Sequence, residues 1–203
     1  MGPIVIDIFI NEAGWSQAKY NAIVGGVVVF GAMFGQIFGG LLGDKFGTRR
    51  VAMVGFLTLS LANAALAMLE PLWTNTTVMT IFLIVQAFVA GIAWICIISL
   101  AMRLTWSKVG GTQFTAYMSL FNLSGVTAYL LTERMIEIFD YSSAIYVGAT
   151  LTMISAIMLI FIDEDETDRV LEGRLGDEDE DEWWTEEGES MEGAELGEHA
   201  TVA

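Results

Sequence analysis

The chain contains few residues that could carry out covalent chemistry, and they do not come in catalytic combinations. It has one cysteine, Cys96, inside an apolar stretch, and one histidine, His199, near its end. A metal site needs several such ligands in a fixed geometry, and a nucleophilic enzyme needs a base beside its nucleophile. The sequence therefore predicts no enzyme activity, no bound metal and no cofactor. We also expect no nucleic-acid partner.

Charged residues that could form ion pairs gather in one short segment, residues 40–50, here called the hairpin segment. Asp44 and Lys45 are followed there by Arg49 and Arg50, and an uncharged apolar stretch lies on either side. A carboxylate at the end of a helix is favourable only if it faces a helix amino terminus or a cation. The basic residues could instead serve only to fix the orientation of the chain in a membrane.

A second group of polar residues could bind a solute. Thr115, Ser119 and Asn122 are spaced so that they share one face of a helix, and Tyr129 returns to that face. In a membrane such a face should turn away from lipid. The alternative for each residue is a hydrogen bond to a neighbouring helix, without a ligand.

The elements that must position these residues are membrane-spanning helices. The chain is 54% hydrophobic, and five blocks contain no Asp, Glu, Lys or Arg: 22–42, 51–69, 78–102, 114–132 and 143–162. Each block is about 18 to 25 residues long, enough for a helix to cross the bilayer. A soluble protein would have shorter helices with a polar face, and a membrane barrel would have short alternating segments. We predict an all-α, polytopic membrane helix bundle with five complete transmembrane helices.

The first residues predict only part of a sixth helix. Ile4–Ile10 is apolar apart from Asp7 and is too short to cross a membrane unaided. We expect it to be the end of a helix whose beginning is absent from this chain; a short interfacial helix is the alternative. Asp7 is a functional candidate because a carboxylate within a membrane helix is costly to bury.

The excess negative charge lies in the last part of the chain. Residues 1–162 contain seven acidic and seven basic side chains, whereas residues 163–203 contain eighteen acidic and two basic ones. Such a segment cannot bury enough apolar surface to fold, so we predict a disordered acidic tail after a transmembrane domain of residues 1–162. The tail could bind a partner through Trp183 and Trp184, or it could only keep the protein soluble.

The distribution of Lys and Arg predicts how the helices are oriented. Short loops rich in these residues lie on the cytoplasmic side. The hairpin segment and the connection between Arg103 and Lys108 are basic, whereas the connections at 70–77 and 133–142 are not. The hairpin segment and the tail should therefore be cytoplasmic, in a protein of the plasma membrane. The glycosylation triplet Asn75-Thr76-Thr77 falls in a loop predicted to be external.

A stripe of glycines runs along the helix before the hairpin segment. These glycines are four residues apart and lie along one helix face: Gly31, Gly35, Gly39 and Gly43. Without side chains they let a second helix approach closely, which is a main source of helix association in lipid. The partner helix could belong to the same bundle or to another half of a larger assembly. In either case, leucine at Gly35 should weaken the assembly.

The hairpin segment resembles a family signature. Its sequence Gly-Leu-Leu-Gly-Asp-Lys-Phe-Gly-Thr-Arg, residues 40–49, is similar to the G-x-L-x-D-[RK]-x-G-[RK]-[RK] loop of the major facilitator superfamily, and departs from it at Thr48. That resemblance implies a loop between the second and third helices of a six-helix half, which latches two halves together in one state of transport. It assigns this role to six residues: Gly40, Asp44, Lys45, Gly47, Arg49 and Arg50.

Counted from this loop, the helices agree with one half of such a transporter. A partial helix and one full helix precede the loop and four follow it, so residues 1–162 resemble the carboxyl-terminal half, helices seven to twelve, with the first helix truncated. In the family the first, second, fourth and fifth helices of a half line the central cavity. The resemblance therefore places seven residues near the substrate: Asp7, Gln36, Gln86, Trp94, Thr115, Ser119 and Asn122.

The resemblance implies half of a secondary active transporter that moves a small solute by alternating access. Such a chain would need either an amino-terminal half or a second copy of itself. Residues 111–120 are also similar to a segment of the muropeptide-permease and acetyl-CoA-transporter branch. The alternative function is a membrane interaction protein that does not transport and acts through the glycine stripe and the acidic tail.

Overall fold

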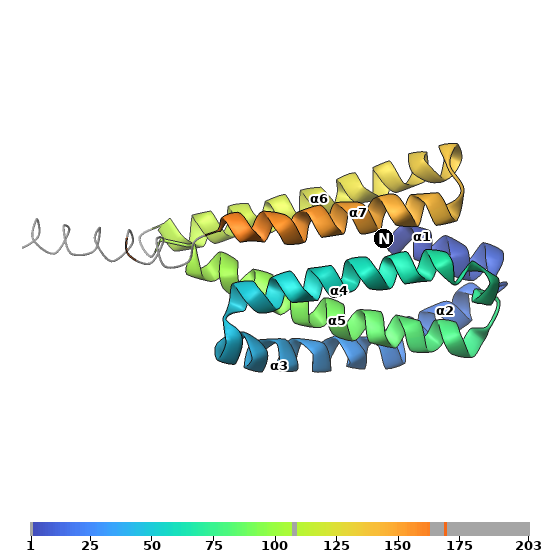
Figure 1. Cartoon of the computed structure of the whole chain (residues 1–203), viewed down its shortest axis with the longest axis horizontal. Coiled ribbons are helices and arrows are strands. Elements are labelled where there is room, and N and C mark those ends of the chain that lie inside the picture. Colours follow the sequence, from blue (N-terminus) through green and yellow to red (C-terminus); the bar gives the residue numbers. More distant parts are fainter. Residues whose placement is uncertain (1, 107–108, 163–168, 170–203) are drawn as a thin grey trace, which may run out of the picture. The chain divides into compact units, whose positions relative to one another are not determined.

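The structure is a computed structural model that describes residues 2–106, 109–162 and Arg169. The predicted acidic tail therefore lies almost entirely outside the described residues. Residues up to Ile162 form one unit, and its described elements are all helices (Figure 1). The predicted all-α bundle is confirmed for this part of the chain.

Four of the helical runs are long and apolar enough to cross a membrane. The first combines α2 (Gln17–Ile23), the π-helical η2 (Val24–Val28) and α3 (Val29–Phe46), and the others are α4 (Thr48–Met68), α5 (Thr76–Arg103), and α7 (Tyr141–Met158) with the 3-10 turn η5 (Leu159–Phe161). These four correspond to four of the five predicted spans.

The fifth predicted span, α6 (Gly110–Ile138), is a helix of 29 residues but does not meet the same apolar criterion. Its length would cross a bilayer, since about 20 residues suffice. Its polar side chains set it apart from the other four runs. They include Thr115, Ser119 and Asn122. The sequence predicts that these residues share one helix face, which contacts either a solute or a neighbouring helix.

Local residue choices set the helix ends. Gly47 joins α3 to α4 at φ 90°, a backbone conformation that favours glycine. Ser16 starts α2 by accepting a hydrogen bond from the Lys19 amide at 3.2 Å. Asn75 starts α5, because its side-chain oxygen accepts from the amides of Thr77 and Val78 at 3.1 and 3.3 Å. Asn75, the first residue of the predicted glycosylation triplet, thus has a structural role as a helix cap.

One end of the bundle, here called the Ser16 end, holds the larger apolar core. There α1 (Gly2–Asp7) continues into the π-helical η1 (Ile8–Glu12), where Ile8 and Phe9 are fully buried. Trp15 packs edge-on against Phe9, with ring centroids 4.6 Å apart. The ammonium group of Lys19 lies 4.3 Å from the centre of the Trp15 ring. The first segment thus packs as part of the bundle core and not as a helix lying on a membrane surface.

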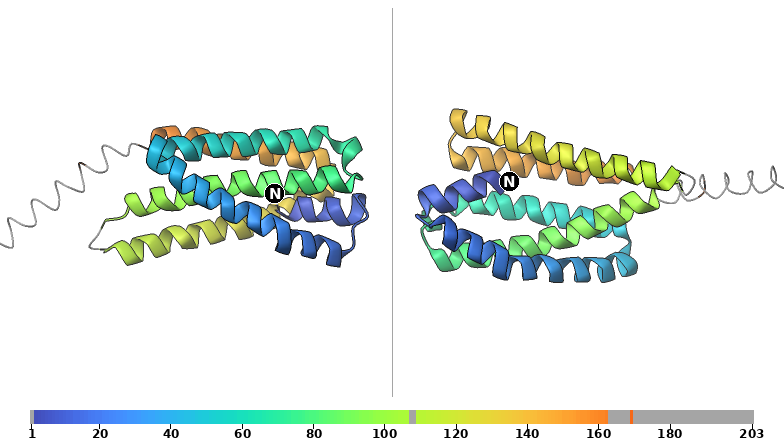
Figure 2. Two further views of the ribbon diagram at one scale, coloured as in Figure 1. Left: turned by 90° about the horizontal axis from the view of Figure 1, so that it is seen from below. Right: turned by 180° about the vertical axis from the view of Figure 1, so that it is seen from behind.

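The opposite end, here called the Gly47 end, has a smaller core formed by Ala52, Cys96, Leu100 and Leu159. The closest helix contacts are those of α3 with α5, α4 with α7 and α4 with α5 (Figures 1 and 2). Helix α6 takes part in none of these three contacts. It contributes only partly buried residues, Met135 and Ile136, to the core at the Ser16 end.

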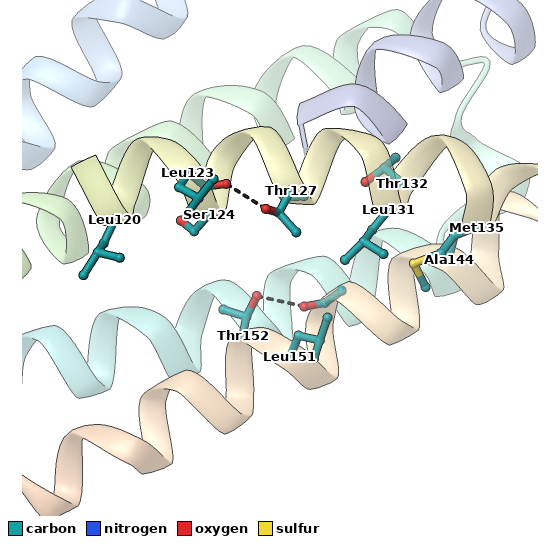
Figure 3. Close-up of a pocket in the computed structure, with 12 residues that line it drawn as sticks. Leu120, Leu123, Ser124, Thr127, Leu131, Thr132, Met135, Ala144, Leu151 and Thr152 are labelled. Carbon is teal, nitrogen blue, oxygen red and sulfur yellow. Dashed lines mark hydrogen bonds between the residues drawn. The ribbon is translucent and has the colours of Figure 1, made fainter. Parts of the chain in front are cut away.

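A groove of about 550 Å³ separates α6 from α7 over much of their length. Figure 3 shows its two walls, with Leu120, Thr127 and Leu131 on α6 facing Leu151 and Thr152 on α7. The helix that carries the predicted polar face is therefore also the most loosely packed of the long helices.

Candidate functional site

The glycine stripe packs against α5 within the bundle. A methyl group added at Gly35 would overlap the carbonyl oxygen of Phe88 and lie 2.9 Å from its carbonyl carbon. One added at Gly39 would lie 2.8 Å from Cα of Ile92. Gly91 of α5 is equally crowded, since a Cβ there would lie 3.1 Å from the amide nitrogen of Gln36. The two backbones approach so closely that only glycine fits at these positions.

The contact between the glycine stripe and α5 is less close at the two ends of the stripe. A methyl group at Gly31 would lie 3.1 Å from the Ile84 carbonyl oxygen, whereas at Gly43 its closest neighbour would be 3.7 Å away. Contact with α5 is thus tightest around Gly35 and Gly39. At Gly43 the neighbours, Cys96 of α5 and Thr48 of α4, lie at ordinary van der Waals distances.

The hairpin segment lies at the Gly47 end with its charges mostly exposed. Asp44, Lys45 and Arg50 are exposed, and in the described part of the chain Asp44 forms no salt bridge. Arg49 is half-buried, and its guanidinium donates a hydrogen bond of 2.6 Å to the carbonyl oxygen of Ile160. Arg49 therefore caps the end of the last helix, where free carbonyl groups favour a cation.

Gln86 is bonded within the bundle. Its amide nitrogen donates to the side-chain oxygen of Asn63 at 2.8 Å, and Asn63 is only 3% exposed. One helical turn from Asn63, the Ser60 hydroxyl donates to the Ala149 carbonyl oxygen at 2.7 Å. For Gln86 the structure therefore shows the interhelical hydrogen bond that the sequence left as an alternative. Gln86 and Asn63 also line a cavity of about 460 Å³.

The three polar residues of α6 are exposed on the helix. The hydroxyl of Thr115 donates to the Gly111 carbonyl oxygen at 2.7 Å, and that of Ser119 to the Thr115 carbonyl oxygen at 2.9 Å. Such bonds to the preceding turn satisfy a hydroxyl donor without a neighbouring helix. Asn122 has no hydrogen-bond partner among the described residues. Of these three side chains, Asn122 is thus the one without a hydrogen bond in the described part of the chain.

The remaining candidates are distributed over three helices. Trp94 on α5 is 45% exposed and lies against Phe121 of α6, with ring centroids 5.6 Å apart. Gln36 is exposed on α3, and Asp7 is half-buried where α1 passes into η1. Trp94 thus lies beside the helix of the polar face, whereas Gln86 faces the inside of the bundle.

The described part of the chain is thus an apolar helix bundle that contains a glycine-lined helix pair and a basic hairpin segment. The family model of the Major Facilitator Superfamily matches residues 1–190. The chain belongs to the major facilitator superfamily. Comparisons with curated proteins and with solved structures give no match. Members of this superfamily are transporters and not enzymes, so the chain is an integral membrane protein of a transporter family.

Sequence reasoning missed two residues that matter in this major facilitator chain. Asn63, the partner of Gln86, follows Ser60 by three residues, and this spacing of two polar residues in an apolar span could have revealed it. Ile160, which accepts the hydrogen bond of Arg49, lies 111 residues further along the chain. Its contribution is a backbone carbonyl, which no residue type can reveal.

Proposed function

We propose that this major facilitator chain is one half of a secondary active transporter that moves a small solute by alternating access. The observation that carries the proposal is the polar face of α6. Thr115, Ser119 and Asn122 are exposed there, and no helix in the described bundle covers them. Uncovered polar groups on a membrane helix are favourable where they line a water-filled path.

A half provides one wall of such a path, and a second half has to provide the other. The second half is an amino-terminal six-helix bundle or a second copy of this chain. The solute then binds between the two halves, with Trp94 and the α6 face on this side. Gln36 and Asp7 belong to the same proposal as further contacts of the path.

The hairpin segment serves in this proposal as the cytoplasmic latch between the halves. Two features support the role: Asp44 has no salt-bridge partner in the described part of the chain, and Lys45 and Arg50 are exposed. The excess of Lys and Arg at the Gly47 end supports a cytoplasmic position for this end. The proposal includes a location in the plasma membrane, with the acidic tail in the cytoplasm.

Accessibility to a water-soluble thiol reagent tests the α6 wall. Cys96 is first replaced by Ala, and single cysteines are placed at Asn122 and, as a matched control, at Leu123, which is 60% exposed. The full chain is then labelled in membranes of cells that also contain its second half. We expect Asn122→Cys to react at least tenfold faster than Leu123→Cys, because a thiol ionises in water and not in lipid. Equal rates would refute the assignment of this face to a water-filled path.

A transport measurement tests the requirement for a second half. Vesicles containing only monomers of this chain should show no solute uptake above protein-free vesicles, because one wall cannot close a path. Uptake by the monomer would contradict the half-transporter proposal. A membrane interaction protein that does not transport would show no uptake, with or without a second half.

A further inference from the structure

A groove of about 330 Å³ lies between α3, α4 and α5 and begins at the Gly47 end of the bundle, where α3 joins α4 (Figure 1). None of the residues predicted to line the solute path contributes to it, and neither does α6. Its residues on α4 share one helix face, since Arg50, Val54 and Thr58 are four residues apart. The groove therefore runs along α4, from the first turn of that helix into the span.

Beyond Arg50 the wall of the groove is apolar. Val54 is 59% exposed in it, and Val89 and Ile92 of α5 form the other side. The polar side chain among the described residues of this part is Thr58, whose hydroxyl donates to the Val54 carbonyl oxygen at 2.8 Å. Because α4 is long and apolar enough to cross a membrane, an apolar chain fits this exposed surface.

Two cations without a counter-charge lie where the groove begins. Arg50 lines the groove and is exposed, and the ammonium group of Lys45 lies 5.3 Å from the centre of the Phe46 ring, which also lines it. Neither cation has a hydrogen bond or a salt bridge in the described part of the chain. Asp44 precedes Phe46 by two residues, about 200° around the helix, and lines a different cavity. The positive charge at this end of the groove is therefore not balanced by a carboxylate in its wall.

We propose that this groove binds an anionic phospholipid. The phosphate contacts the Arg50 guanidinium and the Lys45 ammonium group, and one acyl chain lies along Val54 and Val89. Arg presents paired N–H donors to a phosphate, and Lys acts on it as a point charge. The dimensions agree, because Thr58 lies eight residues beyond Arg50, about 12 Å along the helix axis. The apolar part of the groove thus reaches from the membrane surface toward the middle of a hydrocarbon core of about 30 Å.

Lipid binding at this site does not depend on transport, since it requires only that the Gly47 end lies at a membrane surface. In the transporter proposal the same two cations form the latch to a second half. Binding is therefore measured on this chain without a second half, which leaves both cations accessible to lipid.

Photolabelling tests this site in the full chain, reconstituted in phosphatidylcholine vesicles. The probes are phosphatidylglycerol and phosphatidylcholine that carry the same diazirine-labelled acyl chain, added in equal amounts. Label at Val54 and Val89 is quantified by mass spectrometry, relative to label at Ile154 of α7, which is 45% exposed and does not line the groove. We expect about five to twenty-five times more label from the anionic probe, because each cation near a membrane surface contributes about fivefold.

Charge variants test the role of the two cations. The double variant Lys45→Gln/Arg50→Gln should bring the two probes to equal labelling, whereas Arg50→Lys, which keeps the charge, should retain most of the difference. Arg103→Gln is the matched control, because it removes the same charge from the last turn of α5, at the same end of the bundle but outside the groove. It should leave the preference for the anionic probe unchanged.

A groove-filling variant tests the position of the acyl chain. Val54→Phe should remove label by both probes at Val89, whereas Leu57→Phe, at a position 36% exposed on the same helix and outside the groove, should not. Equal labelling by both probes in the unchanged chain would overturn the proposal. So would the absence of label at Val89, which is expected if a helix of another protein fills the groove. Loss of the anionic label in excess inorganic phosphate, compared with sodium chloride of the same ionic strength, would overturn it as well, since the site would then bind phosphate without a lipid.

Discussion

The contact between α3 and α5 predicts a large difference between two glycines of the same helix. Gly35 faces Phe88 at close range, whereas a methyl group at Gly40 would have no neighbour within 4 Å. In a helix with free space, Gly→Ala stabilises by about 1 kcal/mol, because alanine has the higher helix propensity. We expect Gly35→Ala to destabilise the helix pair and Gly40→Ala to stabilise it slightly.

The size of the effect follows from the distances at Gly35. The added methyl carbon would lie 2.9 and 3.0 Å from the carbonyl carbon and Cα of Phe88, respectively. Contacts between carbon atoms are optimal at about 3.5 to 4.0 Å, so the helices have to separate by roughly 0.5 to 1 Å. A gap of that size removes about a quarter to a half of the dispersion energy along the contact. Overpacking costs about 1 to 3 kcal/mol, and the upper value applies because backbone cannot rotate away.

The single cysteine provides the assay. Cys96 is 2% exposed on α5, and its thiol lies against the Gly39 carbonyl oxygen at 3.5 Å, in the same helix contact. Because this thiol is almost fully buried, a thiol-reactive fluorophore in detergent should reach it much faster once α3 and α5 separate. With a cost of about 3 kcal/mol, Gly35→Ala should raise the rate of labelling roughly a hundredfold. Gly35→Leu should disrupt the pair altogether.

Gly40→Ala controls for the general effect of replacing glycine in this helix. It should label Cys96 no faster than the unchanged chain. The reasoning is refuted if Gly35→Ala and Gly40→Ala label Cys96 at the same rate, since the close approach of backbone at Gly35 would then have no energetic consequence.

Two hydrogen bonds give further predictions. Arg49→Gln should speed amide hydrogen exchange at residues 157–161 roughly tenfold, because a charge-assisted bond to a half-exposed group contributes about 1 to 2 kcal/mol. Arg50→Gln is the control. Equal exchange rates in the two variants would contradict the role of Arg49. Asn63→Leu should lower stability by about 1 to 3 kcal/mol, since it leaves Gln86 unpaired, and adding Gln86→Leu should restore most of it. Thermal unfolding in detergent measures the stability of both variants. A double variant less stable than Asn63→Leu would contradict this prediction.

The membrane spans could be predicted from the sequence because one physical quantity decides them. The length of an uncharged apolar run compared with the thickness of a bilayer gives the number of helices, and four of the runs agree with the structure. The same reasoning gave α6 its length but treated its polar residues as compatible with a span. Their number keeps α6 below the apolar level of the other helices.

The positions of partners were harder to predict, because spacing along one helix says nothing about what lies opposite. The glycine spacing predicted a close helix contact, but only the structure identifies Phe88 and Ile92 of α5 as its other side. For Gln86 the sequence left a substrate contact and an interhelical bond as alternatives. Its partner Asn63 lies 23 residues earlier, on a different helix, and the pairing depends on how α4 and α5 rotate against each other.

The helix contacts themselves indicate which part of the bundle can move most easily. Helices α3 and α5 are joined by backbone contact at glycine, and α4 and α7 by the Ser60 bond and by Arg49 at the end of η5. Moving either pair would break contacts that are specific in distance and direction. Helix α6 has a groove on one side and partly buried contacts at the Ser16 end, so a tilt at the Gly47 end would break few contacts. The helix with the polar face is therefore the one that can change position at the lowest cost.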